Sequence, residues 1–149
     1  METTGIKTTD KLAHCSSLSA KKLYHAEITD RIIAAAITVH KLLGPGFLES
    51  IYEEALAIEL NLMEITYQRQ QAIEIRYRGS IIGRHRLDLV VANKIVVELK
   101  AVKDIDPTHI ATCISYLRAT HLPVGLIINF SEAKIKVKRV INTAEMKIN

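Results

Sequence analysis

The stretch NKIVVELKAV, residues 93–102, has the aliphatic composition of a strand in the middle of a sheet. Two charged residues, Glu98 and Lys100, interrupt it. Successive side chains of a strand point to opposite faces, so Glu98 and Lys100 share one face while Val97 and Leu99 share the other. The segment therefore predicts a largely buried strand that carries a carboxylate and an ammonium group side by side on one face.

Two further strands are predicted immediately before this stretch. Segments 66–77 and 81–92 are rich in β-branched and aromatic residues, and the Arg78-Gly79-Ser80 turn joins them as a hairpin. Asn93-Lys94 then reverses the chain again, which pairs 81–92 antiparallel with the strand that contains Glu98. Three consecutive antiparallel strands are the expected outcome.

Helical periodicity surrounds these strands and extends the prediction along the chain. Helices are expected from near Ile28 to Leu43, from Leu48 to Met63 and from Pro107 to Thr120, and further strands over 123–130 and 134–141. This order predicts a single α/β domain around a mixed sheet. Residues 1–25 are polar and lack periodicity, so we expect a flexible N-terminal extension followed by a domain over 26–149.

Composition narrows the class of protein. A chain of 149 residues suits one domain, and its net charge of +4 permits a polyanionic partner without requiring one. Cys15 and Cys113 are far apart and form no CxxC motif, which argues against a disulfide scaffold or a structural zinc site. No apolar run reaches about 18 residues, so no membrane span is expected. These features favour a cytoplasmic protein.

The predicted strand pairing brings Asp88 close to Glu98 and Lys100, and Glu49 begins the second helix. Carboxylate oxygens suit Mg²⁺, and a nearby lysine could orient the water that attacks a phosphodiester. The residues alone leave an alternative open, because a structural ion-pair network on a solvated sheet face explains the same charges about equally well. Glu49 alone is explained as an acid placed at a helix start by the macrodipole.

A resemblance to known families weighs on this choice. Asp88, followed after nine residues by Glu98-Leu99-Lys100, resembles the catalytic signature of the PD-(D/E)xK nuclease superfamily. In GPGFLESIYEEAL, a glycine, a glutamate and a tyrosine stand at the spacing that names the GxxExxY family, a prokaryotic branch similar to RecB-type nuclease domains; they are Gly46, Glu49 and Tyr52. The resemblance runs from about Glu27 to Asn142.

This resemblance implies a restriction-endonuclease-like αβββαβ core and a metal-dependent nuclease, with DNA favoured over RNA. It implies that Asp88 and Glu98 bind Mg²⁺, for which Mn²⁺ could substitute, and that Lys100 assists the attacking water. Glu49 completes the predicted catalytic set. The carbonyl of Leu99 is a third candidate metal ligand, because an inward-facing acid places the next carbonyl beside the same ion.

Candidate nucleic-acid contacts lie on the hairpin that leads into Asp88 and on the third helix. We expect them at Arg78, Arg84, Arg86, His109 and Tyr116. One position departs from the related domains, in which a glutamine stands four residues before this tyrosine. Here that position is Thr112, whose single hydroxyl replaces an amide donor and acceptor.

Three classes of function follow from the sequence. The first is a Mg²⁺-dependent nuclease. The second is a nuclease-fold protein that binds nucleic acid or a protein partner with weak or no catalysis, as the threonine at position 112 would allow. The third is a partner of another enzyme that uses the acidic second helix, ESIYEEALAIEL, as an interface. A homodimer also stays open.

Overall fold

The computed structural model describes residues 24–146 of the chain, so most of the predicted extension over 1–25 lies outside the described residues. The elements are α2 (Ala26–Leu43), α3 (Glu49–Leu62), β1 (Tyr67–Tyr77), β2 (Ser80–Val91), β3 (Ile95–Lys100), α4 (Pro107–Thr120), β4 (Val124–Asn129), β5 (Lys136–Ile141) and a short 3₁₀ turn (Thr143–Glu145). Each helix and strand predicted from the sequence matches one of these to within two residues. None of the described helices is both long and apolar enough to cross a membrane.

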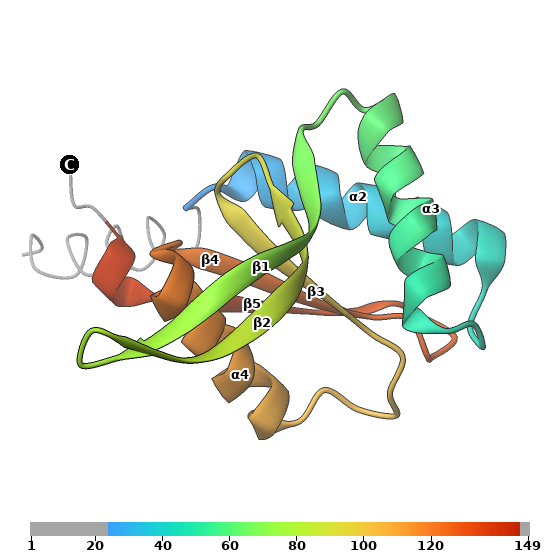
Figure 1. The fold of residues 1–149 in the computed structure, drawn as a ribbon. Coiled ribbons are helices and arrows are strands. Elements are labelled where there is room, and N and C mark those ends of the chain that lie inside the picture. The colour runs from blue at the N-terminus through green and yellow to red at the C-terminus, as the bar shows by residue number, and fades with distance from the viewer. Residues whose placement is uncertain (1–23, 147–149) are drawn as a thin grey trace, which may run out of the picture.

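The five strands form one mixed sheet in the order β1-β2-β3-β4-β5 (Figure 1). All neighbours are antiparallel except β3 and β4, which are parallel and are connected through α4. A parallel pair requires such a crossover, because a tight turn can only reverse the chain. The single-domain α/β fold expected from the sequence, a mixed sheet between helices, is confirmed.

Helices cover both faces of the sheet and produce two core layers. α2 and α3 pack on one face through a cluster that includes Ile32, Leu56 and Phe130, and α4 packs on the other through Cys113 and Leu117. β3 lies between the two layers, and its first five residues are buried. Burial on both faces explains why this strand reads as an almost continuous apolar run.

The strands β2 and β3 pair over only part of their lengths. Their ladder contains three residue pairs, which end at Leu89 opposite Val97. Beyond that pair, β2 continues with β1 as a long hairpin, whereas β3 continues beside β4. The sheet therefore forks, and the fork begins directly before Asp88 and Glu98.

The loop between α2 and α3 fixes where α3 begins. Gly46 has a φ of 109°, which favours glycine. The Tyr52 hydroxyl donates to the carbonyl of Gly44 at 2.6 Å and accepts from the N–H of Phe47 at 3.2 Å. The Tyr52 ring is fully buried and stacks on Phe130 at a centroid distance of 4.4 Å. Tyr52 therefore ties the loop to the core.

Replacement of Tyr52 by phenylalanine tests this tie. Tyr52→Phe keeps the stacked ring but removes two partly buried hydrogen bonds, to the Gly44 carbonyl and from the Phe47 N–H, which should lower the free energy of unfolding by about 1–2 kcal/mol. Urea unfolding measures the loss. Tyr77→Phe is the matched control, because Tyr77 is 60% exposed at the hairpin. Equal stability of the two variants would contradict the role assigned to the Tyr52 hydroxyl.

Candidate active site

A cavity of about 200 Å³ lies at the fork between β2 and β3. Residues from α3, β2, β3, β4 and α4 line it, namely Glu49, His85, Arg86, Asp88, Glu98, Lys100, His109, Thr112, Cys113, Tyr116 and Ile127. The three acids and the lysine selected from the sequence thus open onto one pocket. The antiparallel pairing of β2 with β3, predicted from the short turn at Asn93-Lys94, is confirmed.

Asp88 takes the place of a backbone partner at the fork. Its Oδ2 accepts a hydrogen bond from the N–H of Leu99 at 2.8 Å. Without this carboxylate the Leu99 N–H would face the gap that β2 leaves when it departs from β3. The bond holds the Asp88 side chain against β3, next to Glu98.

Glu98 is buried in the pocket wall, with 8% of its surface exposed. Its Oε1 has no hydrogen-bond partner among the described residues. Burial, followed by the charge of Asp88, raises the pKa of Glu98 to about 8. Burial also raises the pKa of Asp88, and the nearby acids Glu53 and Glu49 raise it further. The pocket therefore favours a bound proton or cation over two free carboxylates.

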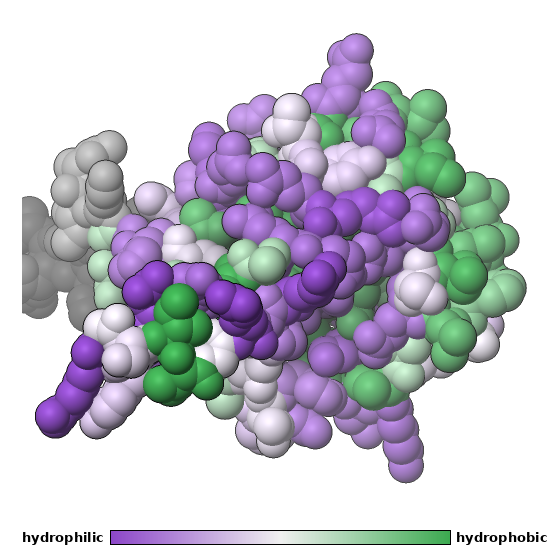
Figure 2. Space-filling model, viewed as in Figure 1, coloured by the Kyte–Doolittle hydropathy of each residue, from purple (hydrophilic) through white to green (hydrophobic). Residues whose placement is uncertain are grey.

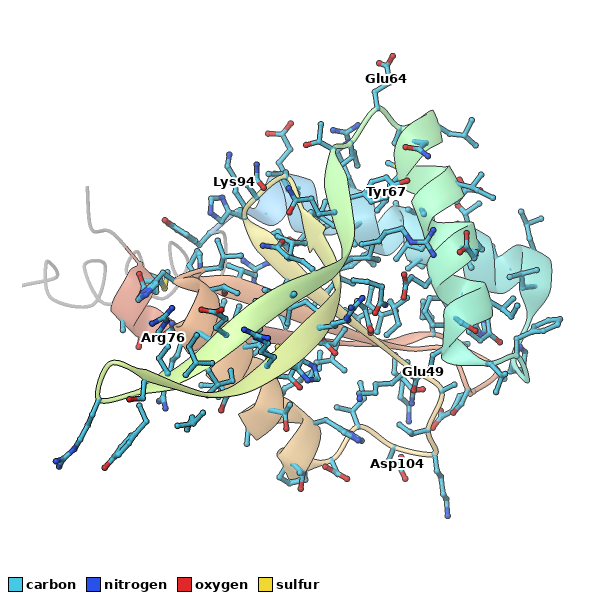
Figure 3. All side chains as sticks on the ribbon, in the orientation of Figure 1. Glu49, Glu64, Tyr67, Arg76, Lys94 and Asp104 are labelled. Atoms are coloured by element: carbon cyan, nitrogen blue, oxygen red, sulfur yellow. The ribbon has the colours of Figure 1, made fainter. Side chains whose placement is uncertain are left out.

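Glu49 and Lys100 complete the polar wall. Glu49 occupies the first turn of α3, beside the segment that leaves β3 (Figure 3), and its Oε1 accepts from the N–H of Ala101 at 3.3 Å. Lys100 is partly buried and forms no ion pair within 4.0 Å among the described residues. Its charge nevertheless lowers the pKa of both Asp88 and Glu98, though by less than burial raises it. The positive charge of Lys100 thus acts on the two acids at a distance and not through a direct ion pair.

The α4 wall carries His109, Thr112 and Tyr116 on one helical face. Asp106 caps the helix: its Oδ1 accepts from the N–H of His109, and His109 Nδ1 accepts from the N–H of Asp106, both at 3.1 Å. His109 is therefore held at the cavity edge by its own helix cap. Pro107 occupies the first turn, as predicted.

His85, which belongs to the basic cluster on the hairpin that leads into Asp88, also lines the pocket. It stacks on Tyr116 with ring centroids 4.3 Å apart and an angle of 17° between planes. Strict alternation from Asp88 places His85 on the opposite face. However, the β1–β2 ladder skips the pair Gln70–Asp88, and Gln70 has a φ of 50°. Leu87 consequently packs in the α4 layer, as Val90 does, although alternation from Leu89 would place it on the α2–α3 side.

A second buried carboxylate, Glu53, does not line the cavity but is close enough to raise the pKa of Asp88, and the sequence analysis missed it. It is 6% exposed, one turn after Glu49. Arg69 Nε lies 2.9 Å from its Oε1, and Gln70 donates to its Oε2 at 2.7 Å. The ion pair with Arg69 offsets the charge of Glu53. Its spacing from Glu49 on one helix was the only available sequence signal.

Not every predicted contact residue lies at the pocket. Arg86, His109 and Tyr116 line it, whereas Arg78 and Arg84 do not. Arg84 lies 3.8 Å from Glu74 on the exposed hairpin, and Arg78 lies over the Tyr77 ring at the hairpin turn. The structure thus places these two arginines along an arm that leads away from the acids.

The donor set agrees with a lightly coordinated hard cation. Within residues 24–146, no group of three or more His, Cys, Asp or Glu side chains lies close enough to hold a metal ion. Asp88 and Glu98 supply two carboxylates, and the unpartnered Oε1 of Glu98 offers a lone pair in a buried wall. Mg²⁺ usually binds through one or two carboxylates and keeps several waters, so this set fits it.

Comparison with known proteins agrees with the fold and with the superfamily suggested by the sequence motifs. The family model described as the PD-(D/E)XK nuclease superfamily matches residues 26–140. The crystal structure of SSO0001 resembles the chain with a TM-score of 0.52 at 16% identity. That match covers 83% of this chain and 62% of the other, so this chain spans less than two thirds of that protein, and the likeness concerns the fold alone. No curated protein matches the chain.

The raised pKa of Glu98 predicts how the stability of the metal-free protein depends on pH. Between a pKa of 4.5 in the unfolded chain and about 8 in the fold, only the folded state keeps the proton. Its stabilising effect is therefore complete below 4.5 and lost as the pH rises toward 8. The expected loss is on the order of a few kcal/mol.

Urea unfolding across this interval measures the loss, and Glu98→Gln should flatten the profile. Glu64→Gln is the control, because Glu64 is exposed and lies outside the cavity. Excess Mg²⁺ should oppose the loss at the upper end of the interval, because it favours the ionised acids. An unchanged slope in Glu98→Gln would assign the pH dependence to other groups.

Proposed function

The chain belongs to the PD-(D/E)XK nuclease superfamily, and we propose that it is a Mg²⁺-dependent nuclease that hydrolyses phosphodiester bonds, with DNA preferred over RNA. The observation that carries this proposal is the pair Asp88 and Glu98 at the sheet fork, with one Glu98 oxygen buried and unpartnered. The Gly46, Glu49 and Tyr52 spacing supports membership of the GxxExxY branch. The resemblance of that branch to RecB-type domains supports DNA as the substrate.

Asp88, Glu98 and the carbonyl of Leu99 would hold the metal ion. Leu99 points its N–H to Asp88, and the N–H and C=O of one strand residue point to the same side. The Leu99 carbonyl is thereby directed toward the Asp88 side of β3. When bound, Mg²⁺, or Mn²⁺ in its place, would lower the pKa of a coordinated water and offset the negative charge of the phosphate.

Lys100 orients the attacking water and stabilises the negative charge that develops on the phosphate. Its side chain lines the same cavity as the two acids, and no ion pair within 4.0 Å engages it among the described residues. A lysine locked in a tight ion pair would have to break that pair before it could act on water. Glu49, hydrogen-bonded to Ala101, acts from the edge of the pocket.

The remaining pocket residues bind the nucleic acid. Arg86 and His109 line the cavity together with the acids and would contact phosphate oxygens there, and Tyr116, stacked with His85, would offer an aromatic surface in the same cavity. Arg78 and Arg84 would contact phosphates farther along the strand, since they lie on the hairpin outside the cavity. Such phosphate contacts position the substrate without reading its sequence.

A nuclease-fold protein that binds nucleic acid or a protein partner with weak or no catalysis is the second candidate. The observation that favours it is Thr112, which lines the cavity where related domains carry a glutamine. The shorter side chain removes an amide donor and acceptor from the pocket. Metal-dependent cleavage of plasmid and single-stranded DNA separates the candidates, because binding without cleavage would support the second.

Lys100→Met tests the catalytic assignment. The variant should bind Mn²⁺ and DNA as the unaltered protein does but cleave on the order of 10²–10³ times more slowly, because an electrostatic stabiliser of the transition state is lost. Lys103→Met is the matched control, since Lys103 is exposed and lies outside the cavity. Asp88→Asn should instead abolish metal binding. Cleavage by Lys100→Met at an unchanged rate would remove Lys100 from the mechanism.

Thr112→Gln tests whether the substituted position limits activity. The added amide should contact the substrate from α4, so KM for DNA should fall or kcat rise by up to about tenfold, as expected for one new hydrogen bond. Ala111→Gln adds the same side chain at an exposed position outside the cavity and should leave both constants unchanged. No gain in Thr112→Gln would show that the threonine does not limit this pocket.

A further inference from the structure

The outer face of α3 carries an exposed apolar stripe. Its residues are separated by steps of three and four, and they are Leu48, Ile51, Ala55, Ile58 and Leu62. The four large side chains are 77%, 44%, 59% and 73% exposed in that order. Figure 2 shows the hydrophobic surface that results, over α3 and the loop before it.

Apart from Ala55, which is partly buried and packs against the core, this stripe is distinct from the face that α3 uses in the core. Tyr52, Leu56 and Leu60 are fully buried against the sheet and α2. A helix that is apolar on two sides is normally covered on both. Large exposed apolar patches on a soluble domain mark interaction surfaces. The second face of α3 therefore lacks a cover within residues 24–146.

The order of residues in the stripe indicates which partner covers it. Read in either direction, the stripe is Leu, Ile, Ala, Ile, Leu. A twofold interface must be self-complementary, and an antiparallel helix pair with this stripe meets that condition. We infer that two copies of this chain pair through antiparallel α3 helices. Ala55 of each copy lies at the twofold axis, where its small side chain permits close approach, Ile51 faces Ile58, and Leu48 faces Leu62.

The exposed area suffices for a dimer. Leu42, 77% exposed at the end of α2, and Phe47, 46% exposed in the loop that leads into α3, add exposed apolar area beyond the stripe itself. With about 150–200 Å² for a fully exposed large side chain, each copy contributes roughly 600 Å², so the pair buries about 1,200 Å². This value lies at the lower end of the range for specific interfaces, which predicts a dimer that dissociates on dilution.

The acidic character of α3 does not oppose this pairing at its centre. Glu54, next to Ala55, is held by Arg69 through two N···O contacts of 3.0 Å and 2.5 Å. Glu53 is buried against the same arginine. Glu49 points to the pocket, where it contacts Ala101, so both pockets stay open when the outer faces of α3 are covered.

Sedimentation of the full chain over a range of concentrations tests the inference. The mass should rise from 16.7 kDa toward twice that value as concentration increases. Ile58→Lys should abolish the dimer, whereas Ile82→Lys should not, since Ile82 is equally apolar and 65% exposed but lies on the hairpin. A monomer at every concentration would overturn the inference and assign the stripe to a different partner. A dimer that persists in Ile58→Lys would overturn the assignment of this surface as the interface.

Cross-linking tests the antiparallel arrangement. In a Cys15→Ser background, Ala55→Cys should form an intermolecular disulfide under mild oxidation, because the two copies meet at this residue. Leu62→Cys alone should not, but it should cross-link to a separately prepared Leu48→Cys chain. A disulfide between two copies of Leu62→Cys would indicate parallel helices and overturn the proposed pairing.

Discussion

The hydrogen bond from the Leu99 N–H to the Asp88 carboxylate is the interaction on which the pocket depends. A strand that parts from its neighbour leaves backbone groups that need new partners when they are buried. At the fork between β2 and β3, a side chain takes over the role that a backbone carbonyl plays elsewhere in the ladder. This exchange of a backbone partner for a side chain accompanies a gap in an otherwise continuous sheet and holds an acid at the edge of the gap. Glu98 and Lys100 then face the gap because they follow on the alternating face of β3.

The fork is electrostatically unfavourable without a cation. Two partly buried acids with raised pKa values share one cavity, and one Glu98 oxygen lacks a hydrogen-bond partner among the described residues. Charged groups that are held together at a cost in local stability are expected at functional sites. The rest of the domain tolerates the conflict because β3 and β4 are buried between two apolar layers. The buried core thus holds the two acids together in one cavity, an arrangement that the proposed metal site would require.

The alternation of side chains made the fold and the acid cluster predictable, and its local failure explains why His85 reaches the pocket. The face shared by Glu98 and Lys100, and the nearness of Asp88, follow from a period of two and one short turn. Alternation alone would place His85 on the face opposite Asp88, but the ladder skips Gln70–Asp88 and the period breaks there, so His85 lines the pocket. Arg78 was predicted as a nucleic-acid contact because it precedes Asp88 in the sequence, but it lies at the hairpin turn, and the part of β2 from Ser80 to Asp88 alone spans about 26 Å. Residues that are near each other in the sequence of an extended strand can lie far apart in space. A cluster of basic residues in the sequence therefore does not show which of them reach the acids.

Helix α3 connects the core to the pocket, and the spacing of Gly46, Glu49 and Tyr52 has a physical reason. Gly46 supplies the backbone angle that turns the chain, Glu49 occupies the first helical turn at the pocket, and Tyr52, almost one turn later, reaches back to the loop. If the tyrosine lost its hold on Gly44, the start of the helix would loosen, and Glu49 would move with it. Tyr52 therefore acts on the pocket through Glu49 and not by contact, since it is fully buried and does not line the cavity. Because Leu48, the first residue of the exposed stripe, directly precedes Glu49, cover on the outer face would hold the same turn from its other side.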